Sequence, residues 1–252
     1  MRAGAMNTTM PMKVDKSPLF EVLFEIRFEP TTPAAGDLLP GLLYSQMKAD
    51  YPDVIPLPMA NIPRQIRDQN PDLLYQASHR LRGTHHSISV GDRVVSLSST
   101  DYPGWNRFKE MVESVIRGVE STGLFKNVER FSFRYINVIE APETDRQLPL
   151  LNVRIELTGS APIERGFLLR VERDEGKFTT VIQITPNSKA TIPIIGKTVS
   201  GLLIDVDTLS VGLGNEFSTN RSFLLEEAHS VVKRTFFSLL SPSTIEKMGP
   251  KW

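Results

Sequence analysis

The segment Arg130–Glu140, RFSFRYINVIE, is the clearest indication of the fold class. Large apolar side chains alternate in it with smaller or polar ones, which is the period of a β-strand with one buried face. One face would carry Phe131, Phe133, Tyr135, Asn137 and Ile139, and the other Ser132, Arg134, Ile136 and Val138. The pattern predicts a central strand whose aromatic face builds the core.

Further strands and two helices are predicted on either side of this stretch. Leu19–Glu29 alternates in the same way, and Gly91-Asp92 predicts a hairpin turn between two β-branched segments. Apolar residues at three- and four-residue spacing predict long amphipathic helices after Pro103 and over about Ser222 to Leu240. The chain is therefore predicted to be α+β, with mainly antiparallel sheets packed around these two helices.

The two halves of the chain show a similar order of elements. Each has hairpin-rich strands, then a strand ending in Ser or Thr, then one amphipathic helix. We predict a disordered N-terminal segment over 1–17, a first α+β half over 18–142 and a second over 143–252, as two similar units or one continuous domain. Less regular stretches predict a strand over Leu151–Thr158, a loop over Pro186–Gly196 and an irregular surface connection over Pro52–Pro71.

Composition excludes several classes of protein. The 252 residues contain no cysteine, which excludes disulfides and thiol-based metal sites and suits a reducing cytoplasm. The 29 Lys and Arg balance the 29 Asp and Glu, so overall charge does not favour a nucleic-acid binder. No apolar run approaches the length of about 18 residues that a membrane span needs. We expect a cytoplasmic protein that does not bind a membrane.

Polar residues on the predicted strands are the candidates for a ligand site. The set is Arg130, Arg134, Tyr135, Asn137 and Arg170. Their arginines could grip a phosphorylated ligand, together with the carboxylates of strands such as the one carrying Glu21 and Glu25. The structural interpretation, in which these groups form ordinary hydrogen bonds and ion pairs, is the favoured one.

Metal and catalytic signatures are weak in this sequence. Asp205 and Asp207 share a strand face and could hold a divalent cation, although such a pair more often contacts basic residues. His229 lies at the edge of the apolar face of the last helix, where packing is the favoured role, and no HExxH spacing supports zinc. The chain has neither a Walker-type phosphate loop nor a Gly-x-Ser-x-Gly elbow. We therefore predict no catalytic residues and no cofactor.

Four segments together carry a family resemblance. They are PLFEVLFEIRF near the start, RFSFRYIN in the middle, LLIDVD later and HSVVKRTFFSLLS in the last helix. In this order the chain resembles an uncharacterised, sporadically distributed family of prokaryotic proteins of about 250 residues. The resemblance implies an accessory protein compatible with a defence-type gene neighbourhood, and it transfers no catalytic residue. Its motif positions include His229 and Phe236 as interaction or structural residues.

Two functional hypotheses follow from the sequence. The first is a non-enzymatic binding or interaction protein with a protein partner, as an accessory or regulatory subunit of a bacterial defence-type system. The alternative is an α+β barrel that binds or hydrolyses a small phosphorylated, nucleotide-like molecule. The first predicts either an exposed apolar patch of about several hundred Å² or a mostly paired set of polar residues without a pocket. The second predicts that Arg134, Arg170 and strand carboxylates converge in one concavity.

Overall fold

The computed structural model describes residues 10–141, 143, 146–155, 167–192 and 196–252. Its strands are β1 (Lys13–Val14), β2 (Leu19–Pro30), β3 (Asp53–Pro56), β4 (Ala77–Arg82), β5 (His86–Gly91), β6 (Val94–Ser99), β7 (Phe125–Glu140), β8 (Leu169–Glu175), β9 (Phe178–Ile192), β10 (Lys197–Ser210) and β11 (Pro250–Lys251). Its α-helices are α1 (Ala35–Met47), α2 (Arg64–Gln69), α3 (Trp105–Ser121), α4 (Glu216–Leu239) and α5 (Pro242–Lys247). Short 3₁₀ turns lie at Pro58–Asn61 and Leu148–Leu150.

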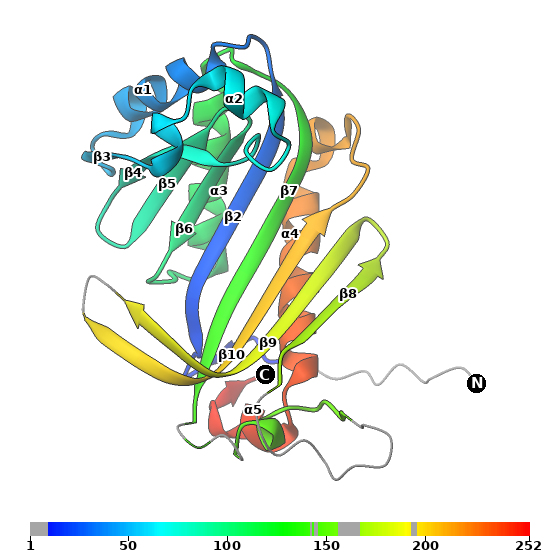
Figure 1. Ribbon diagram of the computed structural model, residues 1–252. Coiled ribbons are helices and arrows are strands. Elements are labelled where there is room, and N and C mark those ends of the chain that lie inside the picture. Colours follow the sequence, from blue (N-terminus) through cyan, green and yellow to red (C-terminus); the bar gives the residue numbers. More distant parts are fainter. Residues whose placement is uncertain (1–9, 142, 144–145, 156–166, 193–195) are drawn as a thin grey trace.

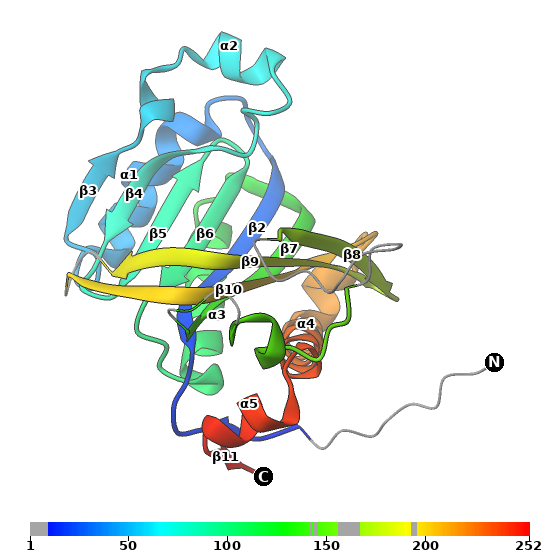
Figure 2. The same ribbon diagram turned by 60° about the horizontal axis from the view of Figure 1, so that its bottom comes forward.

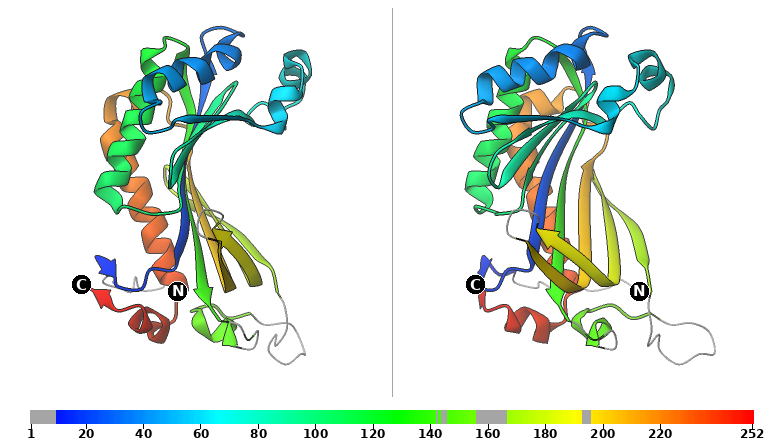
Figure 3. Two further views of the ribbon diagram at one scale, coloured as in Figure 1. Left: turned by 90° about the vertical axis from the view of Figure 1, so that its left-hand side faces the viewer. Right: turned by 60° about the vertical axis from the view of Figure 1, so that its left-hand side comes forward.

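The fold is α+β, as predicted, and its main feature is one large antiparallel sheet (Figure 1). Among the described residues, the sheet has nine strands in the order β3-β4-β5-β6-β2-β7-β10-β9-β8, and β1 pairs separately with β11. Helices α1, α3 and α4 lie on one side of the sheet, which we call the helix face (Figure 3). Helix α2 lies toward the other side, beside one end of the strands. We call that second side the open face.

The core lies between the helix face and the three helices. In the central pair β2–β7, Phe24 is directly opposite Phe133, and their ring centroids are 5.3 Å apart. Phe108 of α3 packs on Phe133 at 6.4 Å, and Phe217 of α4 packs on Phe131 at 5.3 Å. These rings are fully or almost fully buried. The alternation of residue types along β7 therefore arises because one face of the strand is buried, as the sequence pattern indicated.

Two segments of the chain, one from β2 to α3 and one from β7 to α4, build the sheet in corresponding ways. These segments differ from the predicted halves, because β7 lies within the predicted first half over 18–142. Strands β2 and β7, the first strand of each segment, pair at the centre, and the last strand of each segment, β6 or β10, pairs with it on the outer side. Helices α3 and α4 follow β6 and β10 and lie on the same face of the sheet (Figure 3). A duplication of sequence stays a prediction.

The predicted loop over 186–196 is wrong, because β9 continues to Ile192. The β9–β10 pairing shifts by one residue where Thr185 and Ser188 face Leu203 and Gly201, so Pro186 falls in a bulge and donates to no ladder. Asn187 has a φ of 57°, and its backbone N–H donates to Gln147 Oε1 at 2.9 Å. The far ends of β9 and β10 bend toward the open face (Figures 2 and 3).

Three other predictions of local structure need correction. Leu151 forms only an isolated bridge with Leu240, residues 152–155 are not a strand, and 156–158 lie outside the described residues. The connection over 52–71 is not wholly irregular, because it contains β3, a 3₁₀ turn and α2. Of the N-terminal segment predicted to be disordered, residues 1–9 lie outside the described part, and Lys13–Val14 pair with β11.

Candidate functional site

The candidate site residues of β7 divide between the two faces of the sheet. Arg130 and Arg134 lie on the open face, whereas Tyr135 and Asn137 are buried on the helix face. The structure therefore does not bring the predicted arginines and the predicted tyrosine and asparagine into one pocket. Two separate polar groups result, one on each face.

A network of ion pairs occupies the centre of the open face. Arg134 of β7 holds Asp205 of β10 with Nε at 2.9 and 3.0 Å from the two carboxylate oxygens and Nη2 at 2.5 Å from Oδ2. The Asp205 side chain is 9% exposed and that of Arg134 46%. Hydrogen bonding to Asp205 raises the pKa of Arg134, so this guanidinium stays charged.

The network continues onto β2 through one shared carboxylate. Glu25 accepts from Arg27 Nε at 2.7 Å and from Arg130 Nη2 at 3.0 Å through the same oxygen, Oε1. Arg27 and Arg130 are directly opposite each other in the β2–β7 ladder, so their positive charges would repel without Glu25. Farther along β2, burial raises the pKa of Glu21, and a hydrogen bond from Ser98 opposes this rise.

Asp207 is the carboxylate of this network that has the weakest pairing. It is opposite Arg134 in the β7–β10 ladder, but that guanidinium bonds to Asp205 instead. Its Oδ1 atom is buried and has no hydrogen bond to any residue in the described part of the chain. Burial raises the pKa of Asp207 from 3.8 to about 6, although the Arg134 guanidinium works against this shift. Such a carboxyl group can exchange a proton near neutral pH.

We expect Asp207→Asn to raise the free energy of unfolding by about 1 kcal/mol at pH 7.5. Because the folded-state pKa lies above the unfolded one, wild-type stability falls as pH rises from about 4 through 6, and the asparagine variant lacks this loss. The gain should shrink toward zero at pH 4. Urea unfolding at both pH values measures it, with exposed Asp72→Asn as control. Equal gains at both pH values would contradict the assignment.

The second polar group lies on the helix face, where α3 and α4 meet β7. The Tyr135 hydroxyl lies 2.8 Å from His229 Nδ1, and the Trp105 ring stacks on the His229 ring with centroids 3.9 Å apart. Burial lowers the pKa of His229 to about 4 and raises that of Tyr135, so Tyr135 can donate to a neutral imidazole. Trp105 Nε1 donates to Glu226, which also accepts from Lys109. This group joins α3 to α4 and the sheet.

The remaining predicted residues have separate surroundings. Asn137 donates to the carbonyls of Tyr135 at 3.3 Å and Ile204 at 3.5 Å, which satisfies a buried amide within the sheet. Phe236 is buried in α4 beside Phe237, with ring centroids 5.2 Å apart. Arg170 lies on the open face of edge strand β8 and contacts Glu172 at 2.6 Å. It is three strands from β7, which separates its backbone from that of Arg134 by roughly 14 Å.

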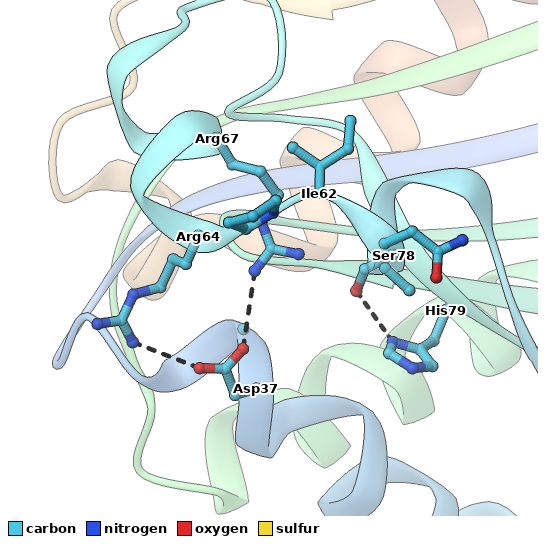
Figure 4. Close-up of a pocket in the computed structure, with 10 residues that line it drawn as sticks. Asp37, Ile62, Arg64, Arg67, Ser78 and His79 are labelled. Atoms are coloured by element: carbon cyan, nitrogen blue, oxygen red, sulfur yellow. Dashed lines mark hydrogen bonds and ion pairs between the residues drawn. The ribbon is translucent and has the colours of Figure 1, made fainter.

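A pocket outside this set was missed by the sequence analysis. It has a volume of about 370 Å³ and lies between the start of α1, the segment that ends in α2, and β4 (Figure 4). Its polar lining comes from Asp37, Asn61, Arg64, Arg67, Ser78 and His79. The six-residue helix α2 is too short for a helical period to show in a proline-rich stretch, so the spacing of Arg64 and Arg67 gave no signal.

Within the described residues, no group of three or more His, Asp or Glu side chains is arranged to hold a metal ion. Asp205 and Asp207 share a face as predicted, but both oxygens of Asp205 contact Arg134. No helix in the described part of the chain is long and apolar enough to cross a membrane.

Comparison with known proteins adds no relative to these observations. No family model matches the chain, and no curated protein matches it in sequence. The resemblance to a prokaryotic family therefore rests on the four segments alone, and the function has to be argued from the geometry of the faces and the pocket.

Proposed function

We propose that this chain is a non-enzymatic binding protein whose open face docks a protein partner of mixed surface charge. The observation that carries the proposal is the pairing of arginines on this face. Five of them each contact a carboxylate of the chain itself: Arg27, Arg82, Arg130, Arg134 and Arg170. A surface with both signs interleaved is complementary to another protein surface, whereas a polyanion favours unpaired cations.

The size of the open face supports the same conclusion. The nine strands have between 4 and 16 residues, and with ~3.3 Å rise per residue and ~4.8 Å between strands they give a face of roughly 1,400 Å². A stable interface of standard size takes about 800 Å² from each partner. Helices α1, α3 and α4 pack on the opposite side, and α2 lies only beside one end of the open face (Figure 3). The face is therefore large enough for one protein partner.

The alternative, a barrel for a phosphorylated ligand, has less support at this site. Arg134 and Arg170 share the open face but are three strands apart, and each has its own carboxylate. A single phosphate group cannot bind two guanidinium groups that lie three strands apart and are each paired with a carboxylate. The family resemblance adds the expectation that the protein partner belongs to a defence-type system, in which this chain would be an accessory or regulatory subunit.

Charge-reversal variants at the rim of the open face test the proposal. Arg82 and Arg170 are 57% and 56% exposed, so Arg82→Glu with Arg170→Glu should leave folding nearly unchanged. The matched control reverses exposed helix-face charges with Arg107→Glu and Arg117→Glu. We expect affinity purification from the native host, followed by quantitative mass spectrometry, to recover the same protein with wild type and control. Recovery should fall at least about tenfold with the open-face variant.

Two outcomes would overturn the proposal. One is that wild-type protein retains no specific protein. The other is that the open-face and helix-face variants retain the partner equally. Small molecules measured in the same eluate address the alternative, since a phosphorylated compound lost only with the open-face variant would favour it instead.

A further inference from the structure

We propose that the pocket between α1, α2 and β4 binds a small organic molecule through its carboxylate or phosphate group, held by Arg64 and Arg67. This inference goes beyond the proposed function, because the pocket is separate from the ion-pair network of the open face. Its volume of about 370 Å³ falls within the range of small-molecule sites, which is about 300–1,000 Å³. Ala60, Ile62 and Pro63 supply an apolar wall for the organic part of the ligand.

Both arginines point at one carboxylate of the chain, that of Asp37, and neither contact is close (Figure 4). Arg64 Nη1 is 3.3 Å from Asp37 Oδ2, and Arg67 Nη2 is 3.7 Å from Asp37 Oδ1. Charge-assisted hydrogen bonds of guanidinium to carboxylate are usually about 2.7–2.9 Å long. Asp37 is thus placed where a ligand anion would lie, but it satisfies neither arginine fully.

Contacts with other residues of the chain fix the position of the Arg67 side chain. Its side chain is only 6% exposed, its Nε atom lies 3.0 Å from Asp92 Oδ2, and its Nη1 atom donates to the carbonyl of Met59 at 3.3 Å. Burial raises the pKa of Asp92, and the nearby Arg67 guanidinium opposes that rise. A buried cation is costly unless it is well paired, so the Nη2 end of Arg67 gains most from a better anion.

Asp37 can make way for such an anion at little cost. Its side chain is 57% exposed, and exposed ion pairs contribute at most about 1 kcal/mol. It lies in the first turn of α1, a helix of thirteen residues whose N-cap, Ala34, provides no side-chain hydrogen bond. The partial positive charge of this helix end adds to the attraction for an anion once Asp37 has turned to solvent.

The remaining pocket groups suit the rest of a polar ligand. Asn61 and His79 also line the pocket, and His79 Nδ1 lies 3.0 Å from the Ser78 hydroxyl. The planar fork of Arg64 and that of Arg67 match the geometry that carboxylate and phosphate oxygens share. The pocket therefore defines the charged group of the ligand, while its apolar wall limits the size of the attached part.

The test measures the melting temperature, Tm, with inorganic phosphate and, separately, with succinate, at constant ionic strength so that screening does not change. We expect at least one probe to raise the Tm of the wild-type protein by about 3 °C at about ten times its Kd. Arg64→Gln should weaken binding about tenfold, because it removes a charge-assisted contact. Asp37→Asn should strengthen binding about fivefold, because it removes the competing carboxylate.

The opposite signs for these two variants distinguish ligand binding from a general loss of structure. Arg82→Gln, an exposed arginine paired with Asp53 away from the pocket, is the control and should bind like wild type. A response to phosphate alone, to succinate alone or to both supports the proposal and identifies the group. No response to either probe, an undiminished response in Arg64→Gln, or weaker binding in Asp37→Asn would overturn it.

Discussion

Replacing Phe133 with alanine is expected to lower the free energy of unfolding by about 4 kcal/mol. Phe133 is fully buried at the centre of β7, where its ring contacts those of Phe24 at 5.3 Å and Trp105 at 5.4 Å. It is therefore packed against a neighbouring strand and against α3 at the same time. Removing it leaves a cavity between rigid elements that cannot close over it, which adds to the lost transfer free energy.

Urea unfolding followed by far-UV circular dichroism measures the effect of Phe133→Ala. The matched control is Phe223→Ala on α4, because that side chain is 62% exposed and its loss should change the stability by less than about 0.5 kcal/mol. If the two substitutions lowered the free energy of unfolding by similar amounts, the placement of Phe133 at the centre of the core would be wrong.

Arg134→Met is expected to lower the free energy of unfolding by about 3 kcal/mol at pH 7.5. Methionine keeps most of the aliphatic length but removes the guanidinium that bonds to both oxygens of Asp205. The Asp205 carboxylate, 9% exposed, then lies beside Asp207 without its cation. Breaking a buried ion pair by removing one partner usually costs about 3–5 kcal/mol of stability. We expect the lower limit of this range here, because the Arg134 side chain is 46% exposed.

The pH dependence shows whether the loss in Arg134→Met is electrostatic. The Arg134 guanidinium lowers the pKa of Asp207, so without it the folded-state pKa of Asp207 should rise further. The deficit should therefore become smaller as pH falls from 7.5 to 4.5 and this carboxylate takes up a proton. Adding Asp205→Asn to the variant should restore most of the stability. Arg82→Met, which breaks an exposed pair, should cost less than about 1 kcal/mol at either pH. A deficit independent of pH would indicate lost packing instead.

The predicted alternation of buried and exposed residues is confirmed in strands whose one face is buried along most of their length. Along β7, Phe131, Phe133 and Tyr135 face the helices, and Arg134 faces the other way, as the alternation predicted. The same applies to β2. Burial on one face imposes a period of two on the chain, and this period is visible in a single sequence.

Predictions failed where long-range pairing outweighs local composition. Pro186 suggested a loop, but the ladder with β10 continues past it through a bulge, supported by the Gln147 side chain from a distant segment. Arg64 and Arg67 fall within a proline-rich stretch, and Asp37 and Asp92 reach them from α1 and from the β5–β6 turn. Nothing in the local sequence records which distant carboxylate will approach an arginine.

The fold class and the two faces of the central strand could be predicted from the amino-acid sequence, because periodic burial leaves a periodic pattern of side chains. Three features depend on the tertiary arrangement: Arg134 bonds to Asp205 rather than Asp207, Tyr135 contacts His229 on the opposite face, and a pocket forms around Asp37. These contacts join residues about 30 to 90 positions apart in the chain. They depend on how strands and helices are ordered in space, and the charge or apolarity of a single residue carries no information about that order.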